Sequence, residues 1–397
     1  MFGPYLQVLR TPRYPFPFGL GLLVSLPLGM VGLALLLTAQ ARTGSLASAG
    51  LAPAAFGLGN AGGLVVQGRL IDRFGPARVI GATSVVCAAA LIGAVTLPDS
   101  RALLVCALVG GVGFPATIST MRVLTTALVR DPRLRMSGYA LLSVSFGLAM
   151  VVGPLLTSLL LAVWTAPGAV LVAAGVVGVG GPVFAATPAV RTWPAHRTVA
   201  GSRFRPGAGL VTVLAVNVAA GLASGARAVA LPAAAVVQDV PALAGVGFAA
   251  LSVGDLLGGL AYGAIRWRAS KAQQLLGSLA AAAVTSGVAA ACAGVLPALF
   301  VVLLLGGTVG AAGGICLSAL LDDVAPPHLL TTAYTTMVGL SLAASAGGNA
   351  AAGSIADAAG PAAGFGLSAA ALGLAAGLLY WRRHTLRSDR AIDVSGR

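Results

Sequence analysis

The sequence predicts an all-α membrane protein with twelve transmembrane helices in two six-helix bundles. Three observations predict it: the composition, the spacing of the apolar runs and the placement of the charges. Of the 397 residues, 58% are hydrophobic and 9% are charged, and the mean hydropathy is +0.96. A soluble domain carries about 25% charged residues. Water would solvate this surface poorly, whereas the hydrocarbon of a bilayer would solvate it well.

Apolar runs of membrane-spanning length recur along the whole chain. A helix that crosses the hydrocarbon core needs about 20 mainly apolar residues, and membrane helices tolerate internal proline and glycine. The first run is longer than the apolar core of a signal peptide and eleven more follow it, so we expect it to be retained. The predicted spans cover residues 16–38, 46–70, 78–98, 102–127, 138–164, 167–189, 209–237, 243–265, 272–294, 298–321, 331–352 and 362–381.

Basic residues concentrate on one side of the predicted membrane. With the N-terminus in the cytoplasm, 20 of the 24 lie in cytoplasmic segments, while Arg42 and Arg101 lie in outer loops and Arg122 and Arg227 within spans. This positive-inside bias predicts cytoplasmic N- and C-termini. It also accounts for the net charge of +14, so no nucleic-acid partner is expected. The lack of glutamate and the 55 glycines suggest a bacterial, high-GC genome, and hence a bacterial inner (cell) membrane.

The longest polar break lies near the middle of the chain and divides the spans into six and six. The predicted organisation is an N-terminal six-helix bundle at 1–189, a cytoplasmic linker at 190–208, and a C-terminal six-helix bundle with a basic cytoplasmic tail at 209–397. Glycine-to-basic loops that begin at Gly68 and Gly258, 190 positions apart, follow the second span of each half. Parallel repeats of six helices are a transporter architecture.

The first of these loops resembles a known motif. It reads GRLIDRFGPAR from residue 68 and is similar to the signature loop of the major facilitator superfamily, G-x-L-x-D-R-x-G followed by basic residues. The resemblance implies that family's fold and a cytoplasmic gate that the loop's aspartate and arginine help to lock. A solvated turn is the alternative interpretation. The matching residues are Gly68, Leu70, Asp72, Arg73, Gly75 and Arg78, whereas Pro76 and Ala77 stand where the family is usually basic.

Two further motifs match the family in part. Gly153-Pro154 in the fifth span resembles the helix-five motif of the bacterial drug/proton antiporter branch, which implies efflux, although a proline kink alone would also explain it. The fourth span has a glycine pair at Gly111 and Gly113, but Ala107 stands where the family's arginine is usually found. A familiar proton-relay arrangement is therefore not carried over to this chain.

Two charges lie deep within predicted spans. Arg227 precedes the outer turn near residue 240 by 13 residues, and Asp255 follows it by 15. At 1.5 Å per residue, both side chains are expected about 20 Å from that turn, near the membrane midplane. Because charges in hydrocarbon are costly, they indicate function by default. One interpretation is a proton-coupling pair at the transport site, and the other is a static ion pair that fixes helix packing.

Polar side chains also recur at helical spacing inside the spans. Such stripes line a central cavity under one interpretation, and under the other they form hydrogen bonds between helices. Neither a metal site nor a cofactor is expected, because the histidines are scattered and the four cysteines lie in apolar runs. The proton or substrate candidates are Asp255, Arg227, Asn217, Ser224, Asn60, Gln67, Ser341, Ser345 and Asn349.

These patterns predict a secondary active transporter that works by alternating access. The expected activity is proton-coupled export of a small amphipathic or hydrophobic molecule, by a monomer in the lipid bilayer. Uptake of a metabolite or sugar is the alternative within transport, and a sensor on the same scaffold is the alternative outside it. An enzyme is not expected, because no clustered catalytic groups occur in the sequence.

Overall fold

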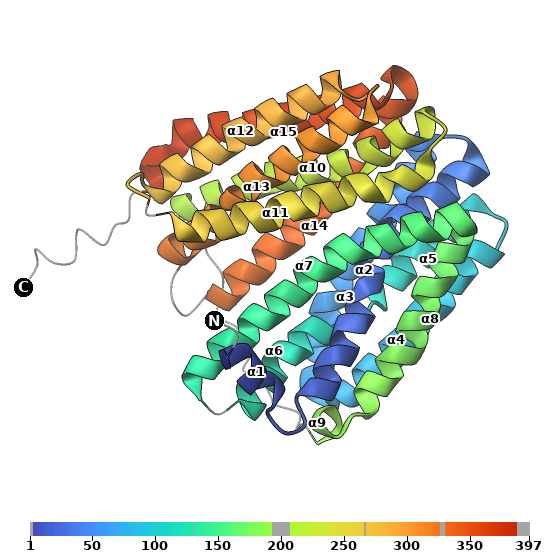
Figure 1. Cartoon of the computed structure of the whole chain (residues 1–397), viewed down its shortest axis with the longest axis vertical. Helices are drawn as coiled ribbons and strands as arrows, with labels where there is room; N and C mark the ends of the chain where they lie inside the picture. The colour runs from blue at the N-terminus through green and yellow to red at the C-terminus, as the bar shows by residue number, and fades with distance from the viewer. Residues whose placement is uncertain (1–2, 130, 193–206, 266, 326–329, 387–397) are drawn as a thin grey trace, which may run out of the picture. The chain divides into compact units, whose positions relative to one another are not determined.

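In the computed structural model of this chain, residues 3–129, 131–192, 207–265, 267–325 and 330–386 are described. Their secondary structure is helical without a strand, as Figure 1 shows. The predicted all-α membrane fold is confirmed. The helices are α1 (Gly3–Leu9), α2 (Pro15–Thr43), α3 (Leu46–Phe74), α4 (Pro76–Thr96), α5 (Ser100–Val112), α6 (Thr117–Leu128), α7 (Pro132–Val163), α8 (Ala166–Ala186), α9 (Pro188–Arg191), α10 (Ala208–Val237), α11 (Ala244–Ala264), α12 (Lys271–Ala291), α13 (Leu296–Val324), α14 (Leu330–Ala359) and α15 (Pro361–Arg382), with short 3-10 helices at Pro241–Leu243 and Arg383–Leu386.

Eleven helical segments of the described residues are long and apolar enough to cross a membrane. The fourth predicted span is two helices, α5 and α6, and the two together count as one of these segments. The remaining predicted span is α14, a 30-residue helix that carries more polar side chains than the others. Each of the twelve predicted spans therefore corresponds to a helical segment. The helix α1 was not predicted.

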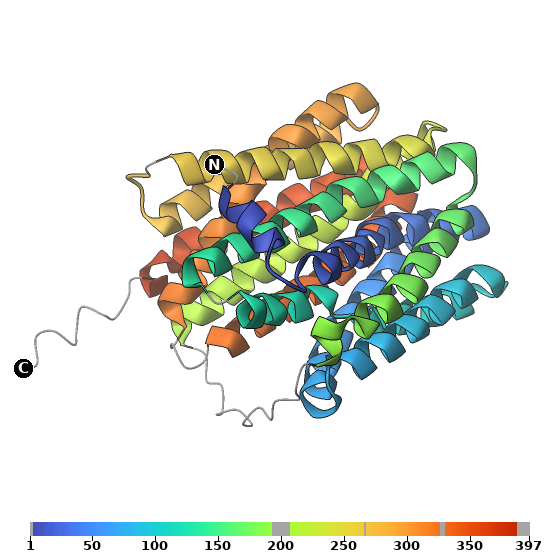
Figure 2. The same cartoon turned by 60° about the horizontal axis from the view of Figure 1, so that its bottom comes forward.

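The chain forms two compact units. The first comprises Met1–Ser45, Leu51–Ala200 and Pro241–Gly245, and the second comprises Leu46–Gly50, Gly201–Val240 and Val246–Arg397. Most of the predicted linker (residues 193–206) and of the basic tail (residues 387–397) lies outside the described residues. Within each unit the long helices run alongside one another, as Figure 1 and Figure 2 show from two directions.

The two units repeat one packing pattern. In the first, α2 packs against α7 and α8, and α4 packs against α5 and α8. In the second, α10 packs against α14 and α15, and α12 packs against α13 and α15. The helices that correspond in sequence order therefore have corresponding neighbours. This is the packing expected of a duplicated six-helix unit.

Glycine contacts set the register of this repeat where α3 crosses α5 and α11 crosses α13. At these glycines the neighbouring backbone is so close that a Cβ atom would collide with it, which is how small residues let membrane helices approach. Gly59, Gly63 and Gly111 occupy the first crossing, and Gly254, Gly258 and Gly307 occupy the second. The three glycines of the first crossing precede those of the second by 195, 195 and 196 positions, in the order given, whereas the two loops suggested a repeat of 190.

The crossing of α2 with α7 likewise corresponds to the crossing of α10 with α14. A Cβ atom on Gly29 would meet the carbonyl oxygen of Ala149, and one on Gly225 would meet that of Ser345. Gly29 and Gly225 are 196 positions apart. The same register therefore extends to a second pair of crossings and assigns an equivalent residue to every position along these helices.

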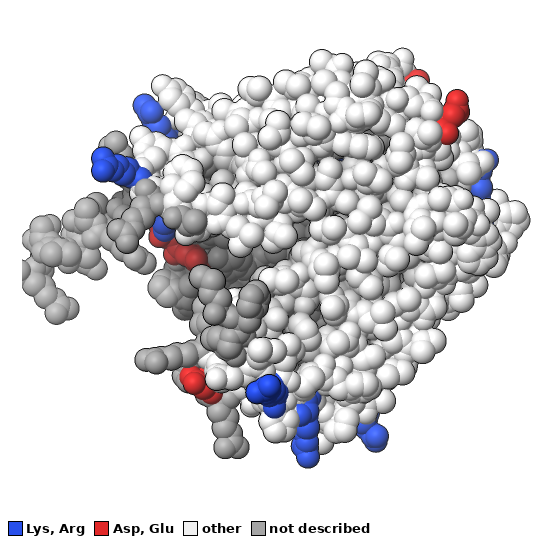
Figure 3. All heavy atoms as spheres, viewed as in Figure 1, with Lys and Arg blue, Asp and Glu red and all other residues white. Residues whose placement is uncertain are grey.

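The outer surface of the helices is apolar over wide areas. Leu374 and Trp381 have exposed fractions of 73% and 76%, and many other large apolar side chains are similarly exposed. On the face shown in Figure 3, charged side chains lie near the margins, with a broad uncharged area between them. Such a surface is stable in lipid rather than in water.

Candidate functional site

The motif loop folds as a single-residue turn between two helices. α3 continues through Asp72 and Arg73 and ends at Phe74, and α4 begins at Pro76. The residue between them is Gly75, with φ of 81°, a conformation that glycine adopts without strain. The Arg73 guanidinium lies 5.1 Å from the centre of the Phe74 ring. The glycine of the motif thus permits the tight turn that brings α3 and α4 together.

Arg227 and Asp255 are electrostatic neighbours in the second unit. Arg227 precedes the end of α10 at Val237 by ten residues, and Asp255 follows the start of α11 at Ala244 by eleven. Both therefore lie about 15 Å along their helices from the same turn. Their opposite charges interact, yet the two side chains do not form a direct ion pair. The separation leaves both groups with unused hydrogen-bonding capacity.

The Arg227 guanidinium is incompletely satisfied. Its Nε atom is buried and has no hydrogen-bond partner among the residues that the structure describes. A buried donor without an acceptor is costly, so native structures rarely keep one without a reason. Asp255 is exposed, and its Oδ1 atom lies 3.7 Å from the place that a Cβ atom on Gly310 would take. An accessible carboxylate beside an unsatisfied guanidinium can exchange partners, which a closed ion pair cannot do readily.

Asn60 is the equivalent of Asp255 in the first unit. A Cβ atom on Gly111 would lie 2.8 Å from the backbone nitrogen of Asn60, and one on Gly307 would lie 2.7 Å from that of Asp255. Asn60 is buried, and its Oδ1 atom has no hydrogen-bond partner among the described residues. The two crossings thus differ at this position by an amide in the first unit and a carboxylate in the second.

Gln67 holds together a break in the fourth span. α5 ends at Val112 and α6 begins at Thr117. Gln67 is 1% exposed, and its Nε2 atom donates hydrogen bonds to the carbonyl oxygens of Val112 (2.9 Å) and Phe114 (2.8 Å). Its Oε1 atom accepts one from the backbone N–H of Ala116, at 3.0 Å. The side chain thereby replaces backbone hydrogen-bond partners that the break removes. Gly113 and Pro115 indicate such a break in the sequence.

The polar candidates of α10 and α14 lie along the crossing of these two helices. Asn217 donates a hydrogen bond from Nδ2 to the carbonyl oxygen of Met337, at 2.8 Å. The backbone carbonyls of Ser341 and Ser345 face Gly221 and Gly225 of α10. Asn349 is buried, and its Oδ1 atom has no hydrogen-bond partner within the described part of the chain, whereas Ser224 is exposed. The structure therefore brings Asn217, Ser341, Ser345 and Asn349 to one helix pair.

Gly153 and Pro154, the helix-five motif, lie where α7 meets α2. A Cβ atom on Gly153 would lie 2.8 Å from backbone atoms of Gly29 and 2.9 Å from the carbonyl oxygen of Leu26. Pro154 lies inside α7, one residue further. The glycine thus permits close backbone contact between α2 and α7.

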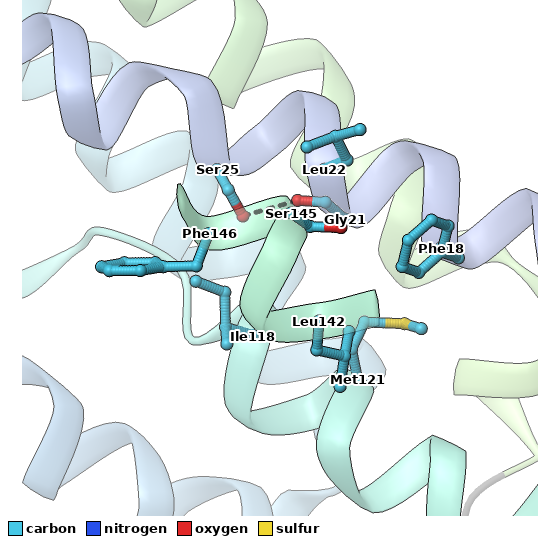
Figure 4. A pocket seen from close by; sticks show the side chains of 9 residues that line it. All are labelled: Phe18, Gly21, Leu22, Ser25, Ile118, Met121, Leu142, Ser145 and Phe146. Atoms are coloured by element: carbon cyan, nitrogen blue, oxygen red, sulfur yellow. Dashed lines mark hydrogen bonds between the residues drawn. The ribbon is translucent and has the colours of Figure 1, made fainter. Parts of the chain in front are cut away.

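A pocket between α2, α6 and α7 was missed by the sequence analysis. It is a small recess, partly open to solvent, and includes Gly21 and Ser25 of α2, Met121 of α6, and Ser145 and Phe146 of α7, as Figure 4 shows. The spacing of Gly21 and Ser25, one helical turn apart, was the available signal. No group of three or more His, Cys, Asp or Glu side chains that could hold a metal occurs in the described ranges.

Comparison with known proteins identifies the family. Residues 18–214 match the family model described as Major Facilitator Superfamily, and that stretch holds the first unit's motif loop and helix crossings. By this match, residues 18–214 belong to the major facilitator superfamily. No curated protein matches the chain in sequence.

Several solved major facilitator structures share the fold over nearly the whole chain. A bacterial homologue of the iron transporter ferroportin, in an inward-facing state, matches with a TM-score of 0.75 and 14% identity, over 92% of this chain and 97% of that one. The nucleoside transporter NupG matches with a TM-score of 0.69 and 14% identity, over 93% and 99%. The human organic anion transporter MFSD10 matches with a TM-score of 0.64 and 19% identity, over 93% and 99%. The chain accordingly shares the fold of these transporters over nearly its whole length.

Proposed function

We propose that this chain is a secondary active transporter that exports a small amphipathic or hydrophobic molecule in exchange for protons, by alternating access. The observation that carries the proposal is the Arg227–Asp255 neighbourhood. It places an exposed carboxylate and a partly buried guanidinium at matching depth in an apolar bundle, without a direct ion pair. Ionisable groups at such depth are retained mainly for function. The bacterial inner membrane and cytoplasmic termini are part of the same proposal.

Asp255 is the proposed proton carrier. When Asp255 is ionised, the pair is neutral and its attraction holds α10 and α11 in one arrangement. When Asp255 binds a proton, that attraction is lost and Arg227 is free to take another acceptor. The proton therefore has a different affinity for the two arrangements, which is the requirement for any ligand to shift a conformational equilibrium. Alternation between two accessible states would then couple proton entry to cargo exit.

Asp255→Asn tests the coupling with little risk to the fold. Asparagine already occupies the equivalent position of the first unit, at Asn60, against the same kind of glycine crossing. The matched control is Asp323→Asn, because Asp323 is an exposed carboxylate whose 2.7 Å ion pair with Lys271 lies outside the apolar bundle. An exposed pair of this kind contributes only about 0–1 kcal/mol to stability.

The assay compares susceptibility to a panel of amphipathic antimicrobials in an efflux-deficient bacterial host. Wild type and Asp323→Asn should confer resistance to at least one compound, and Asp255→Asn should not, at equal amounts of protein in the membrane. In membrane vesicles from the same cells, adding that compound should change the internal pH with wild type and Asp323→Asn. It should leave the internal pH unchanged with Asp255→Asn. Growth on a new carbon source without resistance would favour uptake instead. Resistance unchanged in Asp255→Asn would refute the coupling role.

A further inference from the structure

The helix α3 begins in one unit and continues in the other. Its first turn, Leu46–Gly50, belongs to the second unit, and the rest of the helix, from Leu51, belongs to the first. α11 shows the reverse division, because Pro241–Gly245 belongs to the first unit and the helix from Val246 belongs to the second. Alternating access moves one unit against the other. Each of these two helix starts must then either keep or release the contacts that place it in its unit.

The two helix starts are held by equivalent glycine contacts. A Cβ atom on Gly50 would lie 2.5 Å from the carbonyl oxygen of Asn349 in α14, and one on Gly245 would collide with that of Pro154 in α7. Gly50 precedes Gly245 by 195 positions, and Pro154 precedes Asn349 by the same number. The internal repeat therefore extends to these contacts, and the two starts can be compared residue by residue.

The polar groups that bind the two starts differ in charge. In the first unit, the backbone N–H of Gly245 donates to Ser158 Oγ, a neutral hydroxyl, at 2.9 Å. In the second unit, Asp357 of α14 accepts two hydrogen bonds from the start of α3: the Leu46 N–H donates to Oδ1 at 2.6 Å, and the Ala47 N–H donates to Oδ2 at 2.9 Å. Hydrogen bonds to a charged acceptor are about twice as strong as neutral ones, and the positive end of the helix dipole adds to the attraction. The start of α3 is therefore bound more strongly than the start of α11.

The contact at Asp357 can nevertheless open at moderate cost. Asp357 is exposed, so water can solvate its carboxylate once the backbone N–H groups leave. Asn349, at the same crossing, is buried, and its Oδ1 atom has no hydrogen-bond partner among the described residues, which raises the free energy of the closed arrangement. The apolar contact of the helix start is a small cluster of Leu46 with Ala233 and Ala356. The carboxylate therefore supplies a strong but reversible contact.

We propose that Asp357 is a latch residue, which holds the start of α3 on α14 in this arrangement and releases it when the transporter changes to the other. The proposal rests on the proposed alternating-access function and adds a residue that sets the balance between its two arrangements. In the proposed orientation, with cytoplasmic termini, the contact lies at the outer ends of the two helices, so its release accompanies opening toward the outside. Asp357 acts on the conformational equilibrium, whereas Asp255 responds to the proton.

The test measures how often the start of α3 leaves α14, by the reaction of a maleimide with an engineered thiol in purified full-length protein. Ala356→Cys places the thiol next to Leu46, inside the small buried cluster, so it should react only when the start of α3 is released. Ala375→Cys, a fully buried position of α15 in the same unit, reports unfolding of the unit as a whole. In both reporters alanine replaces the four native free cysteines, Cys87, Cys106, Cys292 and Cys316.

Asp357→Asn should speed the labelling of Ala356→Cys about tenfold. The amide keeps one acceptor oxygen but loses the charge and one of the two hydrogen bonds, and a factor of ten corresponds to about 1.4 kcal/mol. The labelling rate follows the fraction of released molecules when release is fast compared with labelling. Asp239→Asn is the matched control, because it removes the same charge from an exposed side chain just beyond the end of α10. It should leave the rate unchanged.

A second variant changes the donor instead of the carboxylate. Ala47→Pro removes the N–H that donates to Asp357 Oδ2, and proline is tolerated in the first turn of a helix. It should also speed the labelling of Ala356→Cys, by a smaller factor. Its result decides the test if Asp357→Asn does not elute as a monodisperse protein.

Labelling of Ala356→Cys that is unchanged in Asp357→Asn, or that rises equally in Asp239→Asn, would overturn the proposal. Equal acceleration at Ala375→Cys would overturn it as well, because that result marks loosening of the whole unit. The assay needs no cargo, so faster labelling in a protein without transport would keep the latch and reject the transport function. Unchanged labelling alongside intact, Asp255-dependent transport would reject the latch alone.

Discussion

Replacing Gln67 by leucine should destabilise the protein, because this side chain substitutes for backbone partners at the break between α5 and α6. Leucine is similar in size but removes three hydrogen bonds, a partly buried one to Val112 and buried ones to Phe114 and Ala116. At roughly 0.6 to 1.5 kcal/mol for each bond, the free energy of unfolding should fall by about 2–4.5 kcal/mol. The lower figure comes from membrane proteins and the upper from soluble ones.

The assay is reversible unfolding in mixed micelles, followed by circular dichroism. Gln67→Glu is the graded comparison, since a carboxylate keeps the acceptor for the Ala116 N–H but loses both donors. Gln238→Leu is the matched control, because Gln238 donates two longer hydrogen bonds, of 3.2 and 3.1 Å, at a partly buried helix end. It should cost less than Gln67→Leu.

The result also separates two roles for Gln67. A side chain that mainly binds cargo should, when replaced, lower transport and leave stability nearly unchanged. A side chain that stabilises the break between α5 and α6 should, when replaced, mainly lower the free energy of unfolding. If Gln67→Leu unfolds within about 0.5 kcal/mol of wild type, the reasoning from its three hydrogen bonds is refuted.

Three further predictions test other parts of the fold. Gly225→Ala places a Cβ atom against the Ser345 carbonyl and should lower the free energy of unfolding by about 1–3 kcal/mol. The control is Gly366→Ala, whose Cβ atom would meet nothing within 4 Å and which should be neutral or stabilising. Equal effects of the two substitutions would contradict the close contact at Gly225. Arg42→Gln should lower the free energy of unfolding by about 1–2 kcal/mol, because Arg42 donates hydrogen bonds to the carbonyls of Ala94, Val95 and Leu97 at the end of α4. Arg101→Gln is the control and should lower it less. Thermal unfolding of both variants measures the difference. Burial raises the pKa of Tyr14 above its ordinary value of 10.0, and a hydrogen bond with Thr125 partly offsets this, so the contribution of Tyr14 to stability should be full below about pH 10 and fall above it. Tyr14→Phe should make the alkaline fall in stability shallower, and a fall as steep as that of wild type would contradict the assignment.

Much of the fold could be predicted from the sequence because lipid imposes simple rules. Length, apolarity and the positions of arginine predict helices and their order, and each predicted span has its helical segment. The bounds differ mainly where helices run beyond the hydrocarbon. α3, for example, ends at Phe74 and not near residue 70, because the single residue Gly75 makes the turn. Apolarity cannot show where a helix ends once it leaves the membrane.

The sites were predicted less completely because tertiary contacts decide them. The matching depth of Arg227 and Asp255 follows from the hairpin alone, but their lack of a direct ion pair depends on side-chain directions. The repeat register was placed at 190 from two loops, whereas the glycine crossings give 195 or 196. That difference conceals the equivalence of Asn60 with Asp255. The pocket at Gly21 was missed, because its one signal in the sequence is the spacing of Gly21 and Ser25, one helical turn apart.

Asp255 as a proton-driven switch can be tested most directly without any cargo. Spin labels at Arg191→Cys in the first unit and Arg268→Cys in the second, both exposed positions, report the distance between the units by pulsed electron resonance. Since a proton that binds one arrangement better must shift the population, the distance distribution should differ between about pH 5 and about pH 8 in wild type and not in Asp255→Asn. A distribution that ignores pH in wild type, or shifts equally in Asp255→Asn, would contradict the account.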